Sequence, residues 1–215
     1  MNEHLQALKT AVVNGKHLEI EDLVKKALDQ NLDMNDIIND SLIAAMDVVG
    51  QKFSRSEIFV PEMLVSAVSM KKGLDLIKPL LGAEKTESKG TILMGTVKGD
   101  LHDIGKNLVI MILEGAGFKV TDLGVDLSVE KVIQQVQEVQ PDILGLSALL
   151  TTTMPEMRNV ITALEQNGLR NRVKVIVGGA PIDAAFAKKI GSDGYGKDAT
   201  EAVQLARSFV ADRLG

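Results

Sequence analysis

The stretch TILMGTVKGDLHDIGKN, Thr91 to Asn107, joins a short apolar run to a polar loop and then to the start of an amphipathic stripe. A strand-length apolar run followed by a loop and a helical stripe is typical of a fold in which strands and helices alternate. The loop also places His102 between Asp100 and Asp103. The stretch therefore predicts a strand-to-helix turn that carries a polar site.

The same alternation continues to the C-terminus. Further strand-length apolar runs occur at residues 118–123, 143–146 and 173–177, with a weaker one at 193–195. Helical stripes separate and follow these runs at residues 104–113, 129–139, 154–164, 184–190 and 199–214. This pattern indicates a parallel sheet with helices on both faces. Five strands favour the flavodoxin-like (Rossmann-like) doubly wound α/β fold over the six-stranded dinucleotide fold, and its ligands bind outside the carboxyl ends of the strands.

The N-terminal part of the chain shows helical periodicity alone. Four amphipathic stripes with short breaks between them occupy residues 5–12, 20–28, 38–49 and 61–77. They predict an all-α four-helix bundle. A charged segment bounded by glycine follows, and we interpret it as an interdomain linker. The predicted domains are the bundle at 1–82, the linker at 83–90 and the doubly wound domain at 91–215.

Composition excludes several classes of protein. The formal net charge is −5, which argues against nucleic acid as a partner, because phosphate binding needs a basic surface. The chain has no cysteine, so disulfides, cysteine-ligated zinc and thiol catalysis are excluded. No apolar run approaches the roughly 18 residues of a membrane span, and the polar N-terminus does not resemble a signal peptide. We therefore expect a cytoplasmic protein with no membrane partner.

The glycines of the loop at first indicate a phosphate-binding site, but their spacing argues against it. The P-loop pattern has four residues between its glycines and then Lys followed by Ser or Thr. Here Gly99 and Gly105 enclose five residues, and Asn107 follows Lys106. The carboxylate of Asp100 would also repel a triphosphate. Lys106 is expected to face solvent, as most lysines do.

Asp100 and His102 instead have the composition of a metal-ligand pair. A histidine that binds a metal usually donates its other ring N–H to a carboxylate. No second histidine or cysteine lies nearby to complete a zinc site. The residues alone leave two interpretations open: a metal whose other ligands come from a macrocycle, or a loop histidine with ordinary hydrogen bonds.

Three motifs in order resemble the cobalamin-binding signature of methionine synthase and of the corrinoid proteins of methyltransferase systems. They are Asp100-x-His102-x-x-Gly105, Ser147-x-Leu149 and Gly178-Gly179. Residues 46–79 resemble the helical cap that precedes the cobalamin domain in these proteins. The resemblance covers nearly the whole chain and is greatest to free-standing corrinoid proteins that carry methyl groups from methanol, methylamines or similar donors.

The resemblance implies a role for each motif residue. His102 would bind cobalt from below, in place of the cofactor's own dimethylbenzimidazole. Asp100 would hold the outer ring nitrogen of His102, and the hydroxyl of Thr153, or else of Thr152 or Thr151, would continue this relay. The implied cofactor-binding residues are Gly99, Asp100, Leu101, His102, Asp103, Ile104, Gly105, Ser147, Leu149, Thr151, Gly178, Gly179 and Ala199.

The displaced nucleotide tail would run between the strand ends. The glycines at positions 105, 178 and 179 would let the backbone pass close to the tail without a Cβ. The resemblance also implies that Ser147 donates a hydrogen bond to the tail, with Thr151 and Ala199 beside it.

The implied function is a methyl carrier of one-carbon metabolism that is not a complete enzyme. Cobalt(I) of a cobalamin or related corrinoid would accept a methyl group through a substrate-specific methyltransferase, giving the methylcobalamin form. An acceptor methyltransferase, linked to tetrahydrofolate or a thiol, would receive the methyl group, and a reductive activase would rescue oxidised cobalt. Phe59 would cover the methyl face. The alternatives are a cobalamin-based sensor and a small subunit of a cobalamin-dependent mutase. No residue indicates the methyl donor.

Overall fold

A computed structural model describes residues 2–81 and 88–214. The chain divides into two compact units, one of residues 1–88 with 114–117 and one of residues 89–113 with 118–215. Most of the predicted linker, residues 83–87, lies outside the described residues. Within the ranges that are described, no helix combines the length and the apolar character needed to cross a membrane.

The N-terminal unit is helical, as the four stripes predicted. Its elements are α1 (Glu3–Val13), α2 (Ile20–Asp29), α3 (Met34–Asp36), the π-helical segment η1 (Ile37–Ile43), α4 (Ala44–Ser54), α5 (Val60–Ile77) and the 3-10 helix η2 (Lys78–Leu81). Three of the stripes form α1, α2 and α5, and the third stripe in sequence spans η1 and α4. Periodicity at 3.6 residues did not predict the π-helical segment.

Two N-terminal caps show why these helices begin where they do. The side chain of Asn2 accepts a hydrogen bond from the backbone N–H of His4, at 2.9 Å. The carboxylate of Asp33 accepts from the N–H of Asn35 at 2.8 Å and from that of Asp36 at 3.2 Å. Each cap satisfies N–H groups that the first turn of a helix leaves without a partner.

The C-terminal unit is the predicted five-stranded parallel sheet. The strands are β1 (Thr91–Thr96), β2 (Lys119–Asp122), β3 (Ile143–Ser147), β4 (Lys174–Gly178) and β5 (Gly194–Tyr195). The helices are α6 (Ile104–Gly115), α7 (Val129–Val139), α8 (Met154–Gln166), α9 (Ala184–Ile190) and α10 (Ala199–Leu214). The strand order β2-β1-β3-β4-β5 is that of flavodoxin-like folds.

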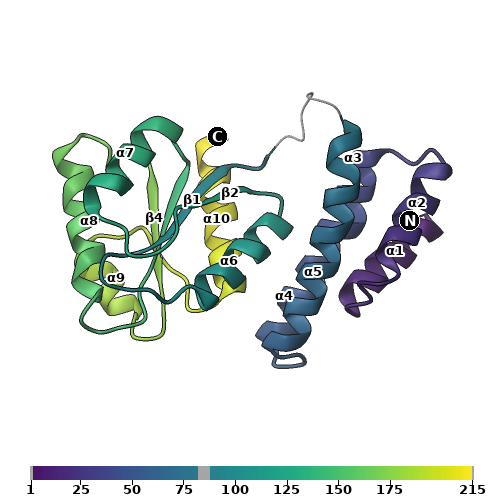
Figure 1. Ribbon diagram of the computed structural model, residues 1–215, viewed down its shortest axis with the longest axis horizontal. Helices are drawn as coiled ribbons and strands as arrows, with labels where there is room; N and C mark the ends of the chain where they lie inside the picture. Colours follow the sequence, from purple (N-terminus) through teal and green to yellow (C-terminus); the bar gives the residue numbers. More distant parts are fainter. Residues whose placement is uncertain (1, 82–87, 215) are drawn as a thin grey trace. The chain divides into compact units, whose positions relative to one another are not determined.

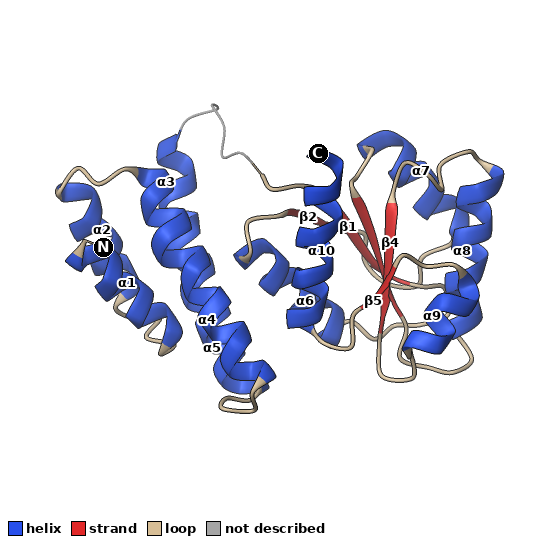
Figure 2. Ribbon diagram, turned by 180° about the vertical axis from the view of Figure 1, so that it is seen from behind, coloured by secondary structure: helices blue, strands red, loops and turns tan. Residues whose placement is uncertain are grey.

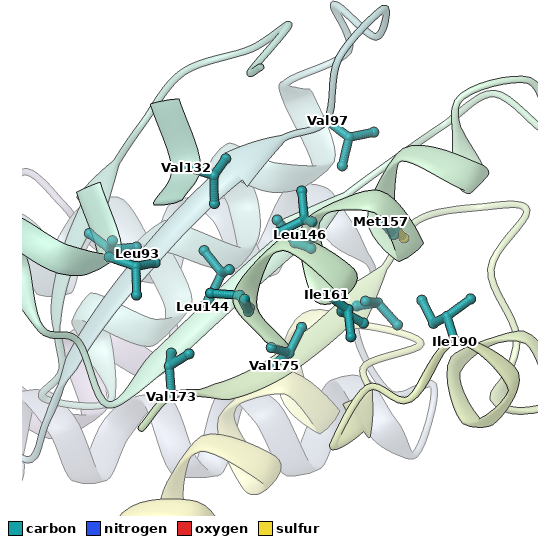
Figure 3. Packing of buried hydrophobic residues seen from close by; sticks show 14 of the residues in the cluster. Leu93, Val97, Val132, Leu144, Leu146, Met157, Ile161, Val173, Val175 and Ile190 are labelled. Carbon is teal, nitrogen blue, oxygen red and sulfur yellow. The ribbon is translucent and has the colours of Figure 1, made fainter. Parts of the chain in front are cut away.

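Helices cover both faces of the sheet. α6 and α10 lie on one face, and α7, α8 and α9 lie on the other (Figure 1, Figure 2). The core beneath α7 and α8 contains strand side chains such as Leu93, Leu144 and Val175, packed with Val132 and Ile161 from the helices (Figure 3). Because both faces are covered, the strands are apolar along most of their length.

The site is placed by the order of the strands. From β1 the chain passes to β2 on one side, and β3 pairs with β1 on the other side, with Thr96 opposite Ser147. The carboxyl ends of β1 and β3 are therefore the topological switch point of the sheet, where ligands bind in doubly wound folds. The loop after β1 and the loop after β3 both begin there.

Candidate functional site

The loop after β1 turns sharply and places Asp100 near the carboxyl end of that strand. Gly99 has a φ of +79°, in the left-handed region that glycine adopts without steric cost. The N–H of Asp100 donates to the carbonyl oxygen of Val97 at 3.2 Å. The hydroxyl of Thr96, at the end of β1, donates to the carbonyl oxygen of His102 at 2.9 Å. The end of the strand thus fixes both sides of the Asp-x-His motif.

The carboxylate of Asp100 is fully buried, with 0% exposed, and its oxygens accept hydrogen bonds from both loops. Oδ1 accepts from the backbone N–H of His102 at 3.1 Å and from ring Nδ1 at 2.7 Å. Oδ2 accepts from the N–H groups of Leu149 at 2.7 Å and Leu150 at 3.2 Å. The hydroxyl of Thr153 donates to the same oxygen at 2.8 Å. Asp100 therefore joins the loops after β1 and β3.

These donors keep the carboxylate charged although it is buried. Burial by itself raises the pKa of Asp100, but the hydrogen bonds from the Leu149 and His102 N–H groups, the His102 ring and the Thr153 hydroxyl hold that pKa well below its usual range. An ionised carboxylate can only accept hydrogen bonds. Nδ1 of His102 therefore carries the proton, and in the neutral ring Nε2 keeps its lone pair and can bind a metal.

Large apolar side chains are exposed on the same two loops. Leu101 and Ile104 follow β1 and are 70% and 86% exposed, and Leu149 and Leu150 follow β3 and are 43% and 40% exposed. The side chain of His102 lies among these positions in the sequence and is 52% exposed. Exposed apolar side chains close in sequence to a half-exposed histidine suit a large ligand with apolar surface.

The three threonines that follow Leu150 occupy different environments. Thr153, which precedes α8, is buried and its hydroxyl lies 2.8 Å from Asp100 Oδ2. Thr151 and Thr152 are exposed. Of the three hydroxyls considered for the relay, the structure thus brings that of Thr153 to Asp100.

The packing of the chain requires glycine at two of the three signature positions. A Cβ on Gly178 would lie 2.9 Å from the carbonyl oxygen of Gly196. Gly179 has a φ of +133°, and its Cβ would lie 1.9 Å from the carbonyl oxygen of Ala148. The packing of the chain itself excludes side chains at both positions. A Cβ on Gly105 would meet nothing within 4 Å, so the fold does not require glycine there and the open space suits a close ligand.

Three further predicted contact residues lie on or next to β3, α10 and α6. Ser147 ends β3 and pairs with Gly178 of β4. Ala199 is buried at the start of α10. The carboxylate of Asp103 is exposed and accepts from the side-chain N–H of Asn107 at 3.1 Å, which ties it to the first turn of α6.

Lys106 corrects an expectation from the sequence. It was expected to face solvent, but it is only 3% exposed. Its ammonium donates to Asp122 Oδ1 at 2.5 Å and to Asn107 Oδ1 at 2.9 Å. The prediction was wrong because the aspartate that closes β2 lies beside the first turn of α6, and its charge allows the lysine to be buried.

Two further residues near the site were missed in the sequence. The carboxylate of Asp126, in the loop after β2, accepts from the N–H of Gly99 at 2.7 Å. The hydroxyl of Thr200, next to Ala199, is buried and has no hydrogen-bond partner among the described residues. The position of Asp126 just after a strand was a usable signal, because strand ends meet at one edge of the sheet. Nothing in the local sequence marks Thr200.

The donor set fits a metal held mainly by a macrocycle. Within residues 2–81 and 88–214, no three His, Asp or Glu side chains are grouped so that they could hold a metal ion by themselves. His102 offers one nitrogen, supported by Asp100, among exposed apolar side chains and beside the open space at Gly105. These features match a ligand that brings its own metal and its own equatorial donors.

Comparisons with known proteins agree with this chemistry. Residues 90–204 match a family model described as a B12 binding domain, and residues 4–78 match a second model with the same description. The chain is 41% identical to a corrinoid protein of Desulfitobacterium hafniense, over 96% of this chain and 97% of that protein. It is 43% identical to dimethylamine corrinoid protein 1 of Methanosarcina acetivorans, over 97% of this chain and 98% of that protein.

A solved structure shares both units. It is the crystal structure of a methanol:cobalamin methyltransferase complex from Methanosarcina barkeri, with a TM-score of 0.87 and 32% identity over 98% of this chain and 80% of the matched chain. The likeness therefore extends over the helical unit as well as the sheet.

Proposed function

The chain belongs to the corrinoid proteins of methyltransferase systems, and from this membership we propose which of its residues hold the cofactor. It is a methyl carrier that binds cobalamin or a related corrinoid and works with a substrate-specific methyltransferase. The bound cobalt supplies the chemistry, because it accepts a methyl group and later releases it. The relatives do not favour the alternatives of a sensor or a mutase subunit.

In this proposal, His102 would hold the cobalt through Nε2. The observation that supports it is the 2.7 Å contact between Nδ1 of His102 and the ionised, buried carboxylate of Asp100. That contact leaves Nε2 as the unprotonated nitrogen and raises its basicity as a ligand. Thr153 and the N–H of Leu149 hold the other carboxylate oxygen. They fix the direction in which Asp100 presents its acceptor to the ring.

The exposed apolar side chains would hold the corrinoid through its apolar surface. Leu101, Leu149 and Leu150 lie on the loops that Asp100 joins, and Ile104 begins α6 directly after the first of them. Burying four such side chains against a large ring contributes favourable free energy in proportion to the apolar area removed from water. Gly99 and Asp103 lie beside these apolar residues in the sequence. The carboxylate of Asp103 accepts a hydrogen bond from Asn107 in the first turn of α6.

Residues at the strand ends would hold the nucleotide tail of the corrinoid. Gly105 would leave space for it, and Ser147 and Thr151 would contact it through their hydroxyls. Ala199 lies at the start of α10 beside Thr200, whose buried hydroxyl has no partner among the described residues. Gly178 and Gly179 keep the neighbouring loops close together, because their missing Cβ atoms allow the contacts with Gly196 and Ala148.

The finer description of the partners also belongs to this proposal. The methyl donor is a methylamine or methanol, selected by the cognate methyltransferase. An acceptor methyltransferase linked to tetrahydrofolate or to a thiol would receive the methyl group, and a reductive activase would restore cobalt that has been oxidised. We place this exchange in the cytoplasm.

The test is the absorption spectrum of the reconstituted protein. We expect wild-type protein loaded with hydroxocobalamin to show the base-off, histidine-ligated spectrum, and His102→Ala to lose it. His17→Ala is the matched control, because His17 is an exposed histidine of the helical unit, and its spectrum should equal that of wild type. An unchanged spectrum in His102→Ala would exclude His102 as the ligand. Failure of wild type to bind any corrinoid would exclude the cofactor itself.

A further inference from the structure

The loop after β2 holds the Asp-x-His motif on its N-terminal side through one residue. The carboxylate of Asp126 accepts a hydrogen bond from the N–H of Gly99 at 2.7 Å. The backbone N–H of the same Asp126 donates to the carbonyl oxygen of Asp100 at 3.0 Å. Asp126 therefore contacts both ends of the Gly99–Asp100 segment, once as acceptor and once as donor.

The same loop is also attached on the C-terminal side of the motif. Asp122, at the end of β2, accepts from the buried ammonium of Lys106 in the first turn of α6. Its Oδ1 also accepts from the N–H of Gly124 at 2.9 Å, which closes the loop on itself. The residues from Asp122 to Asp126 thus contact the polypeptide before and after His102.

The backbone at Asp126 is in an uncommon conformation. Its φ is +52°, in the left-handed region, which is unfavourable for a residue with a Cβ and which aspartate and asparagine tolerate better than most residues. The neighbouring Leu127 is held in register, since its N–H donates to the carbonyl oxygen of Thr96 at 3.1 Å. Such conformations persist where the surroundings fix them, often at functional sites.

Packing does not explain Asp126. The residue is exposed, and its recorded hydrogen bonds go to backbone groups of Gly99 and Asp100. The backbone dihedral angles of Gly99 set the direction in which the chain enters Asp100. Glycine has more accessible backbone conformations than any other residue. A fixed acceptor at the Gly99 N–H removes that freedom just before the carboxylate that orients His102.

We propose that Asp126 is a positioning residue for the axial histidine. It fixes the Gly99–Asp100 segment so that Asp100 Oδ1 faces the Nδ1–H of His102. This contact holds the ring in the orientation in which Nε2 would bind the cobalt. The inference rests on the proposed role of His102 as a cobalt ligand. It assigns to an exposed carboxylate, outside the signature motifs, an effect on the metal through Gly99, Asp100 and His102.

Two substitutions separate the acceptor from the backbone conformation. Asp126→Gly accepts the positive φ and loses the side-chain acceptor, whereas Asp126→Asn accepts the same φ and keeps an oxygen at that position. Asp142→Gly is a matched control, because Asp142 also accepts a backbone N–H on β1, that of Thr91 at 2.7 Å, at the amino end of the strand. The control removes a similar bond far along the strand from the site.

Two measurements report on positioning rather than on folding. In the apo protein, ring nitrogen chemical shifts give the population of the Nδ1–H tautomer of His102, and amide exchange gives the protection of Gly99. In the protein loaded with hydroxocobalamin, the absorption spectrum gives the histidine-ligated fraction, and titration gives the dissociation constant. Wild type and His102→Ala define the two ends of the scale.

We expect Asp126→Gly to weaken corrinoid binding about tenfold, the lower end of the effect of outer-shell partners on metal affinity. It should also lower the Nδ1–H population and the protection of Gly99. Asp126→Asn should stay near wild type in all of these, and Asp142→Gly should lose stability alone. Asp126→Ser, with a shorter acceptor, should fall between Asn and Gly, and it replaces the glycine variant should that protein not fold.

Wild-type affinity and tautomer in Asp126→Gly would overturn the inference, as would an equal loss in Asp126→Asn or in Asp142→Gly. These outcomes differ from failure of the proposed function, in which wild type and His102→Ala would give the same spectrum.

Discussion

At the scale of a single residue, Asp100 shows how a buried charge can be stable without a cation beside it. Removing a carboxylate from water is costly, yet Asp100 is fully buried. Its oxygens accept hydrogen bonds from Leu149, Leu150, Thr153 and both N–H groups of His102. Donors fixed by two loops replace the solvent, so the residue that orients His102 also joins the loops.

This arrangement predicts a specific pH dependence of stability. The pKa of Asp100 is lower in the folded protein than its usual value of about 3.9. Its contribution to the free energy of unfolding is therefore fully present above that usual value and is lost as pH falls toward the folded value. We expect apo Asp100→Asn to be less stable than wild type at pH 7, with a difference that shrinks below about pH 4. Urea unfolding at several pH values measures it, and a difference independent of pH would contradict the prediction.

At the scale of an element, the first turn of α6 and the end of β4 use glycine for opposite reasons. Gly105 faces open space, whereas Gly179 is enclosed by the loop after β3, with a Cβ that would overlap the Ala148 carbonyl. One glycine leaves room for something outside the chain, and the other leaves room for the chain itself. Alanine substitutions at Gly105 and Gly179 can therefore be compared with each other.

Alanine at these positions should separate binding from folding. Gly105→Ala should leave the apo protein as stable as wild type or up to about 1 kcal/mol more stable, since alanine is the better helix former, and it should weaken corrinoid binding. Gly179→Ala should destabilise the fold itself by several kcal/mol, because the φ of +133° and the overlap both oppose a Cβ. Urea unfolding and hydroxocobalamin titration of each variant test this. Unchanged binding in a folded Gly105→Ala would remove that glycine from the cofactor site.

At the scale of the whole molecule, a carrier must protect a reactive group and still present it to partners. The chain supplies a helical unit and a sheet unit, matched by separate family models. The helical unit has a large exposed aromatic at the start of its last long helix, Phe59, which is 64% exposed. We expect this residue to cover the methyl group of the loaded cofactor.

Removing that ring should leave the methyl group less protected. Phe59→Ala should bind corrinoid as wild type does but lose the methyl group faster under illumination, because water and oxygen reach the cobalt more easily. Leu18→Ala is the control, since Leu18 is another exposed apolar residue of the same unit, 78% exposed. The rate of methyl loss, followed by absorption, tests the prediction, and equal rates in the three proteins would exclude a protective role for Phe59.

Much of the molecule follows from the sequence by itself. Apolar periodicity predicted the helical bundle and the five-stranded doubly wound sheet, and α7, α9 and α10 have the predicted bounds. Asp100 and His102 were recognisable as a pair because they are two residues apart in the sequence. Residues this close along the chain stay close in space however the rest of the chain folds. Local patterns of this kind are set by helix and strand geometry, which depends on neighbouring residues alone.

Other features were decided by tertiary structure. The choice of Thr153 over its neighbours depends on how the loop after β3 meets β1. The burial of Lys106 and the hold of Asp126 on Gly99 depend on where β2 ends beside them. Contacts between neighbouring strands depend on strand register and on loop conformation. Both involve residues that are far apart in the sequence. The sequence by itself therefore determined the strands, the helices and the Asp-x-His motif, and the tertiary structure decided that Thr153 and Asp126 contact the segment that holds His102.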